Sequence, residues 1–496
     1  MLKYCAALCL VVLAVGCSSG QGGLRVDTTP AGAELLIDGR RAGVTPHLET
    51  GLVPGEYAVE VRLHGYEPWQ GQATVAAGRI ELLKVGLSRL GRLHLTLIPS
   101  AATAAIDGVA VTGLEVPLSQ GPHVLEVTAG KRAWKGTCWV FKPRGQGAGI
   151  LPDGVSMAVV NLTEGYTVLG YPFTGYLSAA YGIPAGWVPD GRACLLGDEV
   201  VLLDLDKLTA DRLPLTAGDL SWSPDGKHLA AITSEGVMLY AADGSSTRLV
   251  LSRQQAMVRL DGTISGLIWS PDSTRVACTV GQWYDRIFIC PVAGNPYPVA
   301  LELPYDTRGF PVAWSRAGRL ILQVVNLRGP AGEMEVSEEG LSWDLASVRT
   351  DGTGFLLLTA AVPGEHYTFS ALAPSGNRVA FTLRRRDRRW GHAGDPERWD
   401  AGSVRTDAGG LVVYTDNGSS GGGVFTKDER HVLGVSLTGD WLELRLWPTA
   451  GGASRLVAQL PSLSGHDRPD AVLLANGDAS RIWVLAPDCH WLVLKH

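Results

Sequence analysis

Residues 222–230 read WSPDGKHLA, and residues 269–277 repeat this stretch as WSPDSTRVA. In both copies an aromatic residue ends an apolar segment, Pro-Asp favours a tight turn, and a second apolar segment follows. Weaker copies occur along the rest of the chain. The copies begin at Trp187, Trp222, Trp269, Trp314, Leu372, Phe425 and Leu474, which lie 35 to 58 residues apart. The sequence therefore predicts a tandem repeat of short strands joined by tight turns.

The period of this repeat is close to the length of one four-stranded blade of a β-propeller. Seven copies predict seven blades within residues 151–496, and six blades are the alternative. The last unit, residues 471–496, has room for only about three strands. We expect a strand at residues 155–162 or 166–171 to complete it, because closure of the ring removes exposed strand edges.

The repeated motif resembles the WD-like repeat of TolB-type β-propellers, and the resemblance covers residues 187–496. In that family the Pro-Asp-Gly turn is structural, and six blades are the usual number. The resemblance therefore implies that Asp190 and Asp225 form turns rather than take part in catalysis.

The segment before the repeats alternates between apolar and polar residues, as in YAVEVRLH at residues 57–64. A period of two is typical of a β-strand with one buried face. Five positions of this segment recur 69 residues later: Leu24, Pro30, Ile37, Asp38 and Gly39 return as Leu93, Pro99, Ile106, Asp107 and Gly108. We therefore predict two tandem copies of one small β fold.

The first copy resembles the PEGA domain, a small β-sandwich-like module of bacterial envelope and surface proteins. The resemblance rests on PAGA at 30–33, IDG at 37–39, GVTP at 43–46, GLVPG at 51–55 and HGY at 64–66. The second copy keeps IDG at 106–108 but has PSAA at 99–102 and lacks the Gly-Tyr pair. We assign residues 24–90 to a PEGA domain and residues 91–150 to a degenerate PEGA-like domain. PEGA modules carry no known chemistry, so the resemblance implies spacing or binding.

The first residues have the pattern of a secretory signal peptide, because Lys3 precedes an apolar segment that ends at small residues. The stretch LAVGC at residues 13–17 resembles the lipobox of bacterial lipoproteins, in which the signal is cut before the cysteine and its sulfur is diacylated. We expect residues 1–16 to be the signal, Cys17 to be lipidated and residues 17–23 to be a flexible tether. A plain secretory signal with an incidental cysteine is the alternative. The expected location is the cell envelope, outside the cytoplasm and anchored to a membrane through lipid.

The composition excludes several classes of protein. Charged residues make up 19% and hydrophobic residues 46%, which argues against a disordered chain and against a membrane protein with several spans. The net charge of −6 argues against nucleic acid as the main partner. The cysteines that follow Cys17 are scattered, which predicts neither a disulfide framework nor a zinc site. Cys278 and Cys290 flank a predicted hairpin, and a disulfide bond between them is an alternative.

The sequence has none of the common catalytic motifs: GxSxG, HExxH, a P-loop, or GxGxxG after a strand. We therefore predict no enzyme activity, no cofactor and no metal site. The stretches DLD at 204–206 and DNG at 416–418 favour turns over calcium ligation. The stretch HDR at 466–468 favours a surface loop.

The sharpest local feature is RRRDRRW at residues 384–390, which we place in an insertion between strands at about 378–383 and 410–415. Arginine binds carboxylate and phosphate with two hydrogen bonds and stacks on aromatic rings. The candidate ligand-binding residues are therefore Arg384, Arg385, Arg386, Arg388, Arg389 and Trp390. Anionic lipid headgroups or wall polymers are the expected ligands. A solvated loop, or pairing with the acidic run GEMEVSEE at 332–339, is the alternative.

These patterns predict an all-β envelope lipoprotein in which one or two PEGA-type modules precede a β-propeller. We expect a non-catalytic role, with the propeller as a binding platform for an envelope protein or a cell-wall polymer. A secreted enzyme that acts on a polysaccharide through the centre of the propeller is the alternative. A sensory ectodomain is disfavoured, because no later segment is apolar and long enough to cross a membrane.

Overall fold

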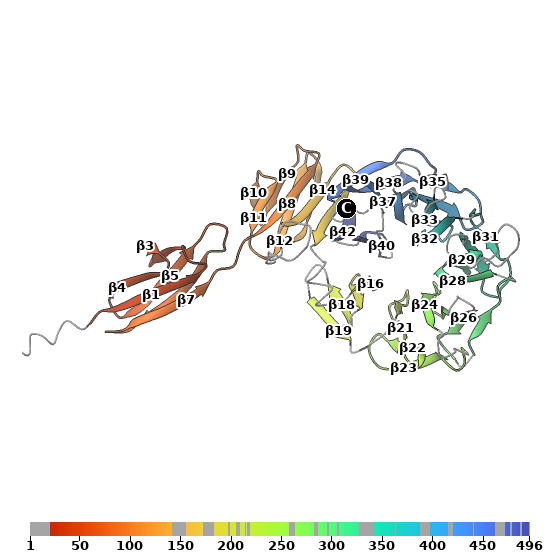
Figure 1. The fold of residues 1–496 in the computed structure, drawn as a ribbon, viewed down its shortest axis with the longest axis horizontal. Helices are drawn as coiled ribbons and strands as arrows, with labels where there is room; N and C mark the ends of the chain where they lie inside the picture. The colour runs from red at the N-terminus through yellow and green to blue at the C-terminus, as the bar shows by residue number, and fades with distance from the viewer. Residues whose placement is uncertain are drawn as a thin grey trace, which may run out of the picture.

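The structure is a computed structural model of the chain. In the described part the chain forms strands and no helix, and it contains no helix that is long and apolar enough to cross a membrane. Two small β modules form a rod beside a ring of β-sheets (Figure 1). The described residues are 20–140, 155–171, 183–196, 199–204, 209–213, 215, 219–256, 263–281, 286–294, 297–304, 307–326, 342–362, 364–386, 397–414, 420–439, 441–461, 472–476, 479–486 and 489–495.

The first module packs a three-stranded sheet against a four-stranded sheet. Its strands are β1 (Gly22–Thr29), β2 (Glu34–Ile37), β3 (Arg40–Val44), β4 (His47–Leu52), β5 (Gly55–Arg62), β6 (Trp69–Val75) and β7 (Ile80–Gly86). The sheets have the orders β4-β1-β7 and β3-β2-β5-β6. The alternation predicted at residues 57–64 is confirmed, since Val59 and Val61 of β5 are buried in the core between the sheets. At the β2–β3 turn, Asp38 has a φ of 48° and its Oδ1 accepts a hydrogen bond from the Ala58 amide at 2.9 Å.

The second module repeats this strand order. Its strands are β8 (Gly91–Ile98), β9 (Thr103–Ile106), β10 (Val109–Val111), β11 (Glu115–Leu118), β12 (Gly121–Ala129), β13 (Arg132–Val140) and β14 (Val155–Asn161). The sheets are β11-β8-β14 and β10-β9-β12-β13, and β14 pairs with β8 in parallel as β7 pairs with β1. The turn residue Asp107 repeats the role of Asp38, with a φ of 52° and an Oδ1 that accepts the Val124 amide at 2.8 Å. The module thus extends through β14, beyond the boundary expected at residue 150.

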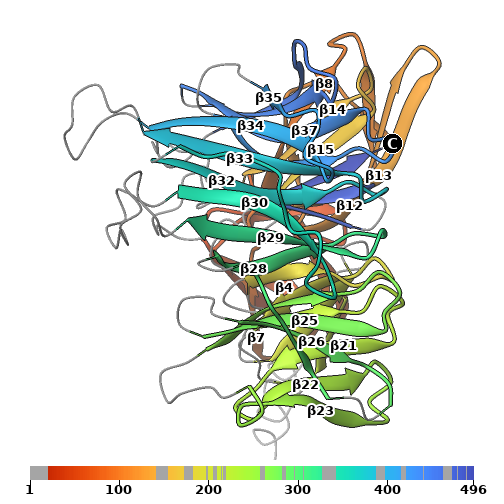
Figure 2. The same cartoon turned by 90° about the vertical axis from the view of Figure 1, so that its right-hand side faces the viewer.

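The ring consists of successive four-stranded groups, which we number one to seven (Figures 1 and 2). Their strands are, in order, β16 (Ile183–Trp187), β17 (Ala193–Leu196), β18 (Val200–Asp204), β19 (Thr209–Leu213); β20 (Leu220–Trp222), β21 (His228–Ile232), β22 (Gly236–Ala241), β23 (Thr247–Ser252); β24 (Ile264–Trp269), β25 (Arg275–Val280), β26 (Arg286–Pro291), β27 (Val299–Leu301); β28 (Thr307–Trp314), β29 (Arg319–Asn326), β30 (Ser342–Arg349), β31 (Leu356–Leu357); β32 (Glu365–Leu372), β33 (Arg378–Arg386), β34 (Glu397–Arg405), β35 (Val412–Tyr414); β36 (Ser420–Phe425), β37 (His431–Thr438), β38 (Trp441–Pro448), β39 (Arg455–Pro461); and β40 (Val472–Ala475), β41 (Arg481–Ala486), β42 (Cys489–Lys495) with β15 (Tyr166–Tyr171). This grouping agrees with the seven-bladed prediction rather than with the six-bladed alternative. The blade number itself stays a prediction, because several connections lie outside the described residues.

The repeated turn motif has a clear structural role. Ser223 Oγ donates to Asp225 Oδ1 at 2.6 Å and accepts the His228 amide at 2.9 Å, which ties the first strand of the group to the second. Gly226 has a φ of 70°, a conformation that favours glycine. Asp190 likewise accepts the Arg192 amide through Oδ1 at 3.0 Å. Both aspartates therefore form turns, as the sequence predicts.

The tryptophans that precede these turns connect neighbouring groups. Trp269 Nε1 donates to the Ser221 carbonyl of group two at 2.8 Å. Trp187 Nε1 of group one donates to the Leu474 carbonyl of group seven, also at 2.8 Å. In these two positions a large aromatic side chain fills the space between two sheets and still satisfies its donor, whereas the Nε1 of Trp222 is buried without a hydrogen-bond partner among the described residues.

The ring is closed by β15, which pairs with β42 from Tyr166↔Lys495 to Tyr171↔His490. Of the two strands proposed for this role, the one at 166–171 performs it. The strand at 155–161, β14, lies on the other side of β15 and connects the second module to the ring. A single sheet with the order β11-β8-β14-β15-β42-β41-β40 results.

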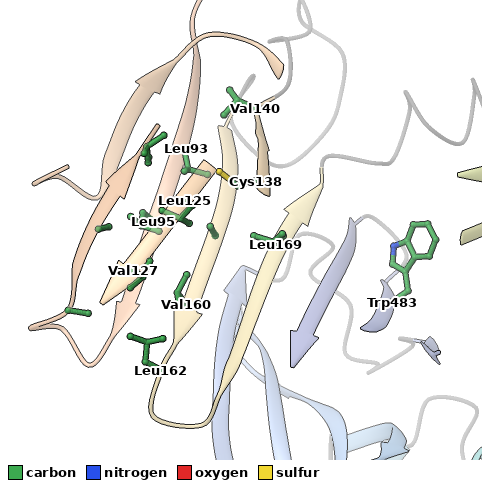
Figure 3. Close-up of a cluster of buried hydrophobic side chains, with 14 of the residues drawn as sticks. Leu93, Leu95, Leu125, Val127, Cys138, Val140, Val160, Leu162, Leu169 and Trp483 are labelled. Carbon is green, nitrogen blue, oxygen red and sulfur yellow. The ribbon is translucent and has the colours of Figure 1, made fainter. Parts of the chain in front are cut away.

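The two faces of β14 are buried in different cores. Ala158 and Val160 belong to the cluster that holds the second-module core together with Trp483 of the ring (Figure 3). Val159 points the other way, into a cluster with strands of groups six and seven. At the end of β14, Asn161 is 2% exposed and donates through Nδ2 to the Val457 carbonyl at 2.8 Å.

We predict that Asn161→Ala weakens the junction between the second module and the ring. The substitution removes the bond to Val457 and the Oδ1 acceptor of the Thr163 and Glu164 amides. Loss of buried hydrogen bonds of this kind costs about 1–3 kcal/mol. Urea unfolding followed by tryptophan fluorescence measures the change. Asn377→Ala, at an exposed turn, is the control and is expected to stay within about 0.5 kcal/mol; equal effects of the two variants would contradict the prediction.

Candidate functional site

The arginine-rich segment begins inside a strand rather than in a loop. β33 extends from Arg378 through Arg386, and β34 begins at Glu397. The insertion is therefore confined to 387–396, and the expectation that the loop starts at Arg384 is wrong. The physical reason is cross-strand pairing, since Arg384 lies opposite Trp399 and Arg385 opposite Arg398 in the β33–β34 ladder.

Arg385 is bound to two carboxylates of neighbouring strands. Its Nη1 donates to Asp400 Oδ2 at 2.8 Å and its Nε to Glu365 Oε1 at 3.2 Å. Arg398 Nε lies 3.3 Å from the same Asp400 oxygen. Asp400 is fully buried, and this burial raises the pKa of its carboxyl, against the opposing effect of Arg398 and Arg385.

Arg384 lies beside this network. Its guanidinium carbon is 5.8 Å from the centre of the Trp399 ring, and its Nη1 is 3.9 Å from Glu397 Oε1. Arg384 and Arg385 are each about one-third exposed and each faces protein carboxylates. These two side chains therefore stabilise group five, and an external anion would have to compete with those carboxylates. The side chain of Arg386 and all of Arg388, Arg389 and Trp390 lie outside the described residues, so their anion-binding role stays a prediction.

The strands that flank the acidic run and the arginine-rich segment end on the same face of the ring. Residues 327–341 and 387–396 both connect the second to the third strand of a group, in groups four and five. These groups are joined by a parallel bridge, Trp343↔His366, and their strands lie side by side in Figure 2. The acidic run 332–339 itself lies outside the described residues, so its pairing with the arginines stays untested.

A second buried carboxylate lies in group four. Asp344 is 6% exposed, and its Oδ1 accepts Thr359 Oγ1 at 2.7 Å and the Ala361 amide at 2.8 Å. Burial raises the pKa of Asp344 as well. Both acids whose pKa is raised in the described chain are thus held by protein donors in the interior, where a polymeric substrate has no direct access.

The second module contains a Ser-His-Asp arrangement that sequence reasoning did not find, because the three residues follow no known motif. His123 Nδ1 lies 2.7 Å from Asp107 Oδ2, and Ser119 Oγ lies 3.4 Å from His123 Nε2. However, His123 Nε2 is closer to the Ser119 carbonyl oxygen, at 2.9 Å. The ring nitrogen that would have to activate the hydroxyl is therefore directed at the main-chain oxygen of Ser119, and the distance to the hydroxyl is long for a nucleophile and its base. The arrangement therefore stabilises the turn and does not activate a nucleophile.

Four cysteines, Cys138, Cys194, Cys278 and Cys290, are buried and unbridged, while the side chain of Cys489 in β42 lies outside what the structure describes. Burial raises the pKa of Cys138 to about 12 and that of Cys194 to about 11, which makes both thiols poor nucleophiles. Cys278 and Cys290 lie on the paired strands β25 and β26. Cys17 lies outside the described residues.

No group of three or more His, Cys, Asp and Glu side chains that could hold a metal ion occurs in the part of the chain that the structure describes. Of the two stretches considered for calcium, the first begins at Asp204, which ends β18. Asp206, the second stretch at 416–418 and the stretch at 466–468 lie outside the described residues.

Comparison with known proteins gives one family match and a set of similar solved structures. The PEGA domain family matches residues 21–88. No curated protein matches the chain. Solved structures with a similar fold include an oligogalacturonate lyase in complex with manganese (13% identity, 71% of this chain and 98% of that one, TM-score 0.45) and TolB from Acinetobacter baumannii (14%, 62% and 79%, TM-score 0.32). The β-propeller domain of the Trilobed protease from Pyrococcus furiosus is also similar (13%, 64% and 86%, TM-score 0.37).

The chain is therefore an all-β protein with an N-terminal PEGA domain and β-propeller relatives among solved structures. These relatives include an enzyme as well as TolB, and at such low identity the similarity concerns the fold alone.

We predict that Arg385→Met lowers the free energy of unfolding at pH 7 by about 1–3 kcal/mol, because Asp400 stays buried and loses one cation. The loss should shrink as the pH falls. The folded pKa of Asp400 is raised, so between the unfolded value of 3.8 and the folded value the native state binds more protons, and stability falls as the pH rises through this window.

Urea unfolding between pH 4 and pH 8 measures this dependence, with the values chosen to bracket the window of a raised Asp pKa, about 4 upward. Arg384→Met is the matched control in the same strand, and we expect it to cost about 1 kcal/mol or less. A loss that is the same at every pH, or the same in both variants, would argue against the role given to Arg385.

Proposed function

We propose that this protein is a non-catalytic lipoprotein of the bacterial cell envelope, anchored through Cys17, whose propeller is a binding platform for an envelope protein or a cell-wall polymer. The observation that carries the proposal is the sheet shared by the second module and the ring. Because the hydrophobic cluster around β14 is continuous across this junction, the ring is held rigidly on the second module.

The position of the rod leaves the ring accessible. The two modules lie beside the rim, and neither covers a face of the ring (Figure 1). The chain enters the first module at Gly22, five residues after Cys17, and the ring lies at the opposite end of the rod. A lipid on Cys17 would therefore hold the first module at the membrane and present the ring away from it.

The two faces of the ring differ in their connections between strands, and this difference supports one of them as the ligand-binding face. On the face with the Pro-Asp-Gly turns, side chains connect neighbouring groups: the Asp225 amide donates to Ser273 Oγ at 3.1 Å, and Ser375 Oγ donates to Glu429 Oε2 at 2.8 Å. The opposite face carries the long connections at 327–341 and 387–396. Ligand-binding residues typically lie on long loops that a rigid scaffold positions. We therefore assign ligand binding to the face from which the long connections leave.

The absence of catalysis is part of the proposal. Asp344 and Asp400 are the buried acids of the described chain whose pKa is raised, and protein donors contact Asp344 Oδ1 and Asp400 Oδ2, while Asp400 Oδ1 is buried without a hydrogen-bond partner. Both carboxyl groups lie in the interior of a sheet group, which supports binding rather than hydrolysis.

The lipid anchor predicts that Cys17→Ser, expressed in full-length form, moves from the membrane to the soluble fraction. The serine hydroxyl cannot be processed by the thioether chemistry of a lipobox cysteine, so no acyl chains are attached. Fractionation with immunoblotting measures the distribution, and Cys9→Ser within the signal is the control that should stay with the membrane. Retention of Cys17→Ser in the membrane would show that the anchor is misassigned.

The platform predicts that one face of the ring contacts the partner. A photo-crosslinking residue at Ser234 or Trp441 samples the face with the long connections, Lys227 and Lys427 sample the opposite face, and Thr247 samples the rim; all five side chains are exposed. In native cells we expect one dominant envelope protein from Ser234 or Trp441 and none from the other three positions. Cross-links from the rim, or equally from both faces, would argue against the assigned face.

A second experiment uses isolated cell-wall sacculi to measure binding of the chain to a wall polymer. If no protein is captured, the mature chain should sediment with the sacculi, and Arg388→Ser combined with Arg389→Ser should weaken this binding and its salt dependence. Release of sugar fragments from the sacculi by the purified chain would instead support the enzyme alternative and refute the non-catalytic role.

A further inference from the structure

Three aliphatic side chains are exposed on the outer face of the β4-β1-β7 sheet of the PEGA domain. Leu48 of β4 is 45% exposed, and Ile80 and Leu82 of β7 are 61% and 48% exposed. In the strand register, Leu48 and Leu82 lie on either side of Arg25 of β1, while Ile80 lies next to Gly23. We call Leu48, Ile80 and Leu82 the sheet-face patch.

The side chains of Leu48 and Ile80 approach each other because β1 has a glycine, Gly23, near its start. A Cβ atom at Gly23 would lie 3.4 Å from Ile80 Cγ1 and 3.8 Å from Leu48 Cδ1. The side chains of the two edge strands thus extend toward each other above the backbone of β1. Val53, in the turn after β4, adds a further exposed aliphatic side chain at the same end of the domain, at 67%.

Few charges lie beside the patch on the outer face of the sheet. Arg25, between Leu48 and Leu82, is paired with Asp27 of the same strand at 2.9 Å, and the exposed Lys84 lies opposite Asp27 on the same face. Exposed aliphatic side chains with a small positive charge at their border favour a lipid surface over a polyanion.

The chain length before β1 identifies that partner. Gly22, the first residue of β1, follows Cys17 by five residues, which span at most about 17 Å when fully extended. The patch lies opposite Gly23 and Arg25, within about 10 Å of Gly22 along the strand. A chain acylated at Cys17 therefore cannot hold this end of the PEGA domain far from the bilayer surface.

We propose that the sheet-face patch is a membrane-contact surface that enters the boundary between lipid headgroups and acyl chains. The inference rests on the lipid anchor of the proposed function, and it goes further by assigning a second, non-covalent contact. The anchor alone leaves the rod free to pivot on a flexible tether, whereas contact through one face of β4-β1-β7 fixes its orientation.

The test uses the mature chain from Ser18 to His496 with an N-terminal histidine tag, bound to phosphatidylcholine vesicles that contain a nickel-chelating lipid. The tag replaces the acyl anchor, so the result does not depend on whether cells acylate Cys17. An environment-sensitive dye at Ile80→Cys reports contact with lipid. The matched control carries the dye at Val109→Cys in the second module, where Val109 is 68% exposed. Wild-type protein taken through the labelling reaction is the blank.

We expect the dye at position 80 to show a blue-shifted, severalfold brighter emission on tethering, and quenching by spin-labelled lipid, at low and high salt alike. The dye at position 109 should not respond. No response at position 80 would overturn the proposal, even if Cys17→Ser had released the protein from cell membranes. A response at position 80 together with membrane retention of Cys17→Ser would support membrane contact through the sheet-face patch and contradict the lipid anchor at Cys17.

A second variant pair confirms that the apolar side chains are responsible. Leu48→Ser, Ile80→Ser and Leu82→Ser combined should release the tethered chain from vesicles at severalfold lower imidazole. The control removes three exposed apolar side chains of the second module: Val109→Ser, Leu114→Ser and Val124→Ser. Identical release of the two variants would contradict the proposal. A dimer in light scattering that only the first variant abolishes would identify a second copy of the chain as the occupant and also overturn it.

Discussion

The double pairing of β14 is the constraint on which the rest of the structure depends. This strand pairs in parallel with β8 and antiparallel with β15, so it belongs to the second module and to the ring at once. Because side chains alternate along a strand, Val160 enters the module core while Val159 enters the core of the ring. Neither unit can rotate against the other without breaking a sheet and exposing two cores. The junction with the first module is smaller: the Gln120 amide donates to Glu67 Oε1 at 2.9 Å, and Leu90 to the Gly65 carbonyl at 2.9 Å.

Much of this architecture could be predicted from local patterns. The tryptophan and the Pro-Asp turn that follows it mark strand ends, because the turn needs specific side chains at fixed positions, such as Ser223 and Asp225. The recurrence after 69 residues predicted two modules of one fold, and the two have the same strand order. The strand that closes the ring was one of two that we proposed. The strands that pair with β14 and β15 could not be predicted. The parallel pairing between β8 and β14, for example, is not encoded in either strand alone.

The candidate site was less predictable, for a related reason. A run of arginines favours a solvent-exposed loop when only the sequence is considered. In the structure Arg385 faces Asp400 and Glu365, which come from two neighbouring strands at distances in sequence that follow no motif. The same holds for His123, whose contacts with Asp107 and Ser119 depend on the register of β12 against β9. The role of a charged side chain in a sheet can therefore be predicted only when its neighbours on the adjacent strands are known.

Closure of the ring has a consequence for how the chain reaches its folded form. Tyr166 pairs with Lys495, so nearly the whole ring is made after β15 and before its partner strand becomes available. A polypeptide that is synthesised from its N-terminus contains β15 long before β42, and contacts between such distant segments form slowly. Until β42 is available, β15 offers an unpaired edge to other chains. Chains that end before β42 are thus the species most exposed to aggregation and proteolysis, while the finished ring has no such edge at this position.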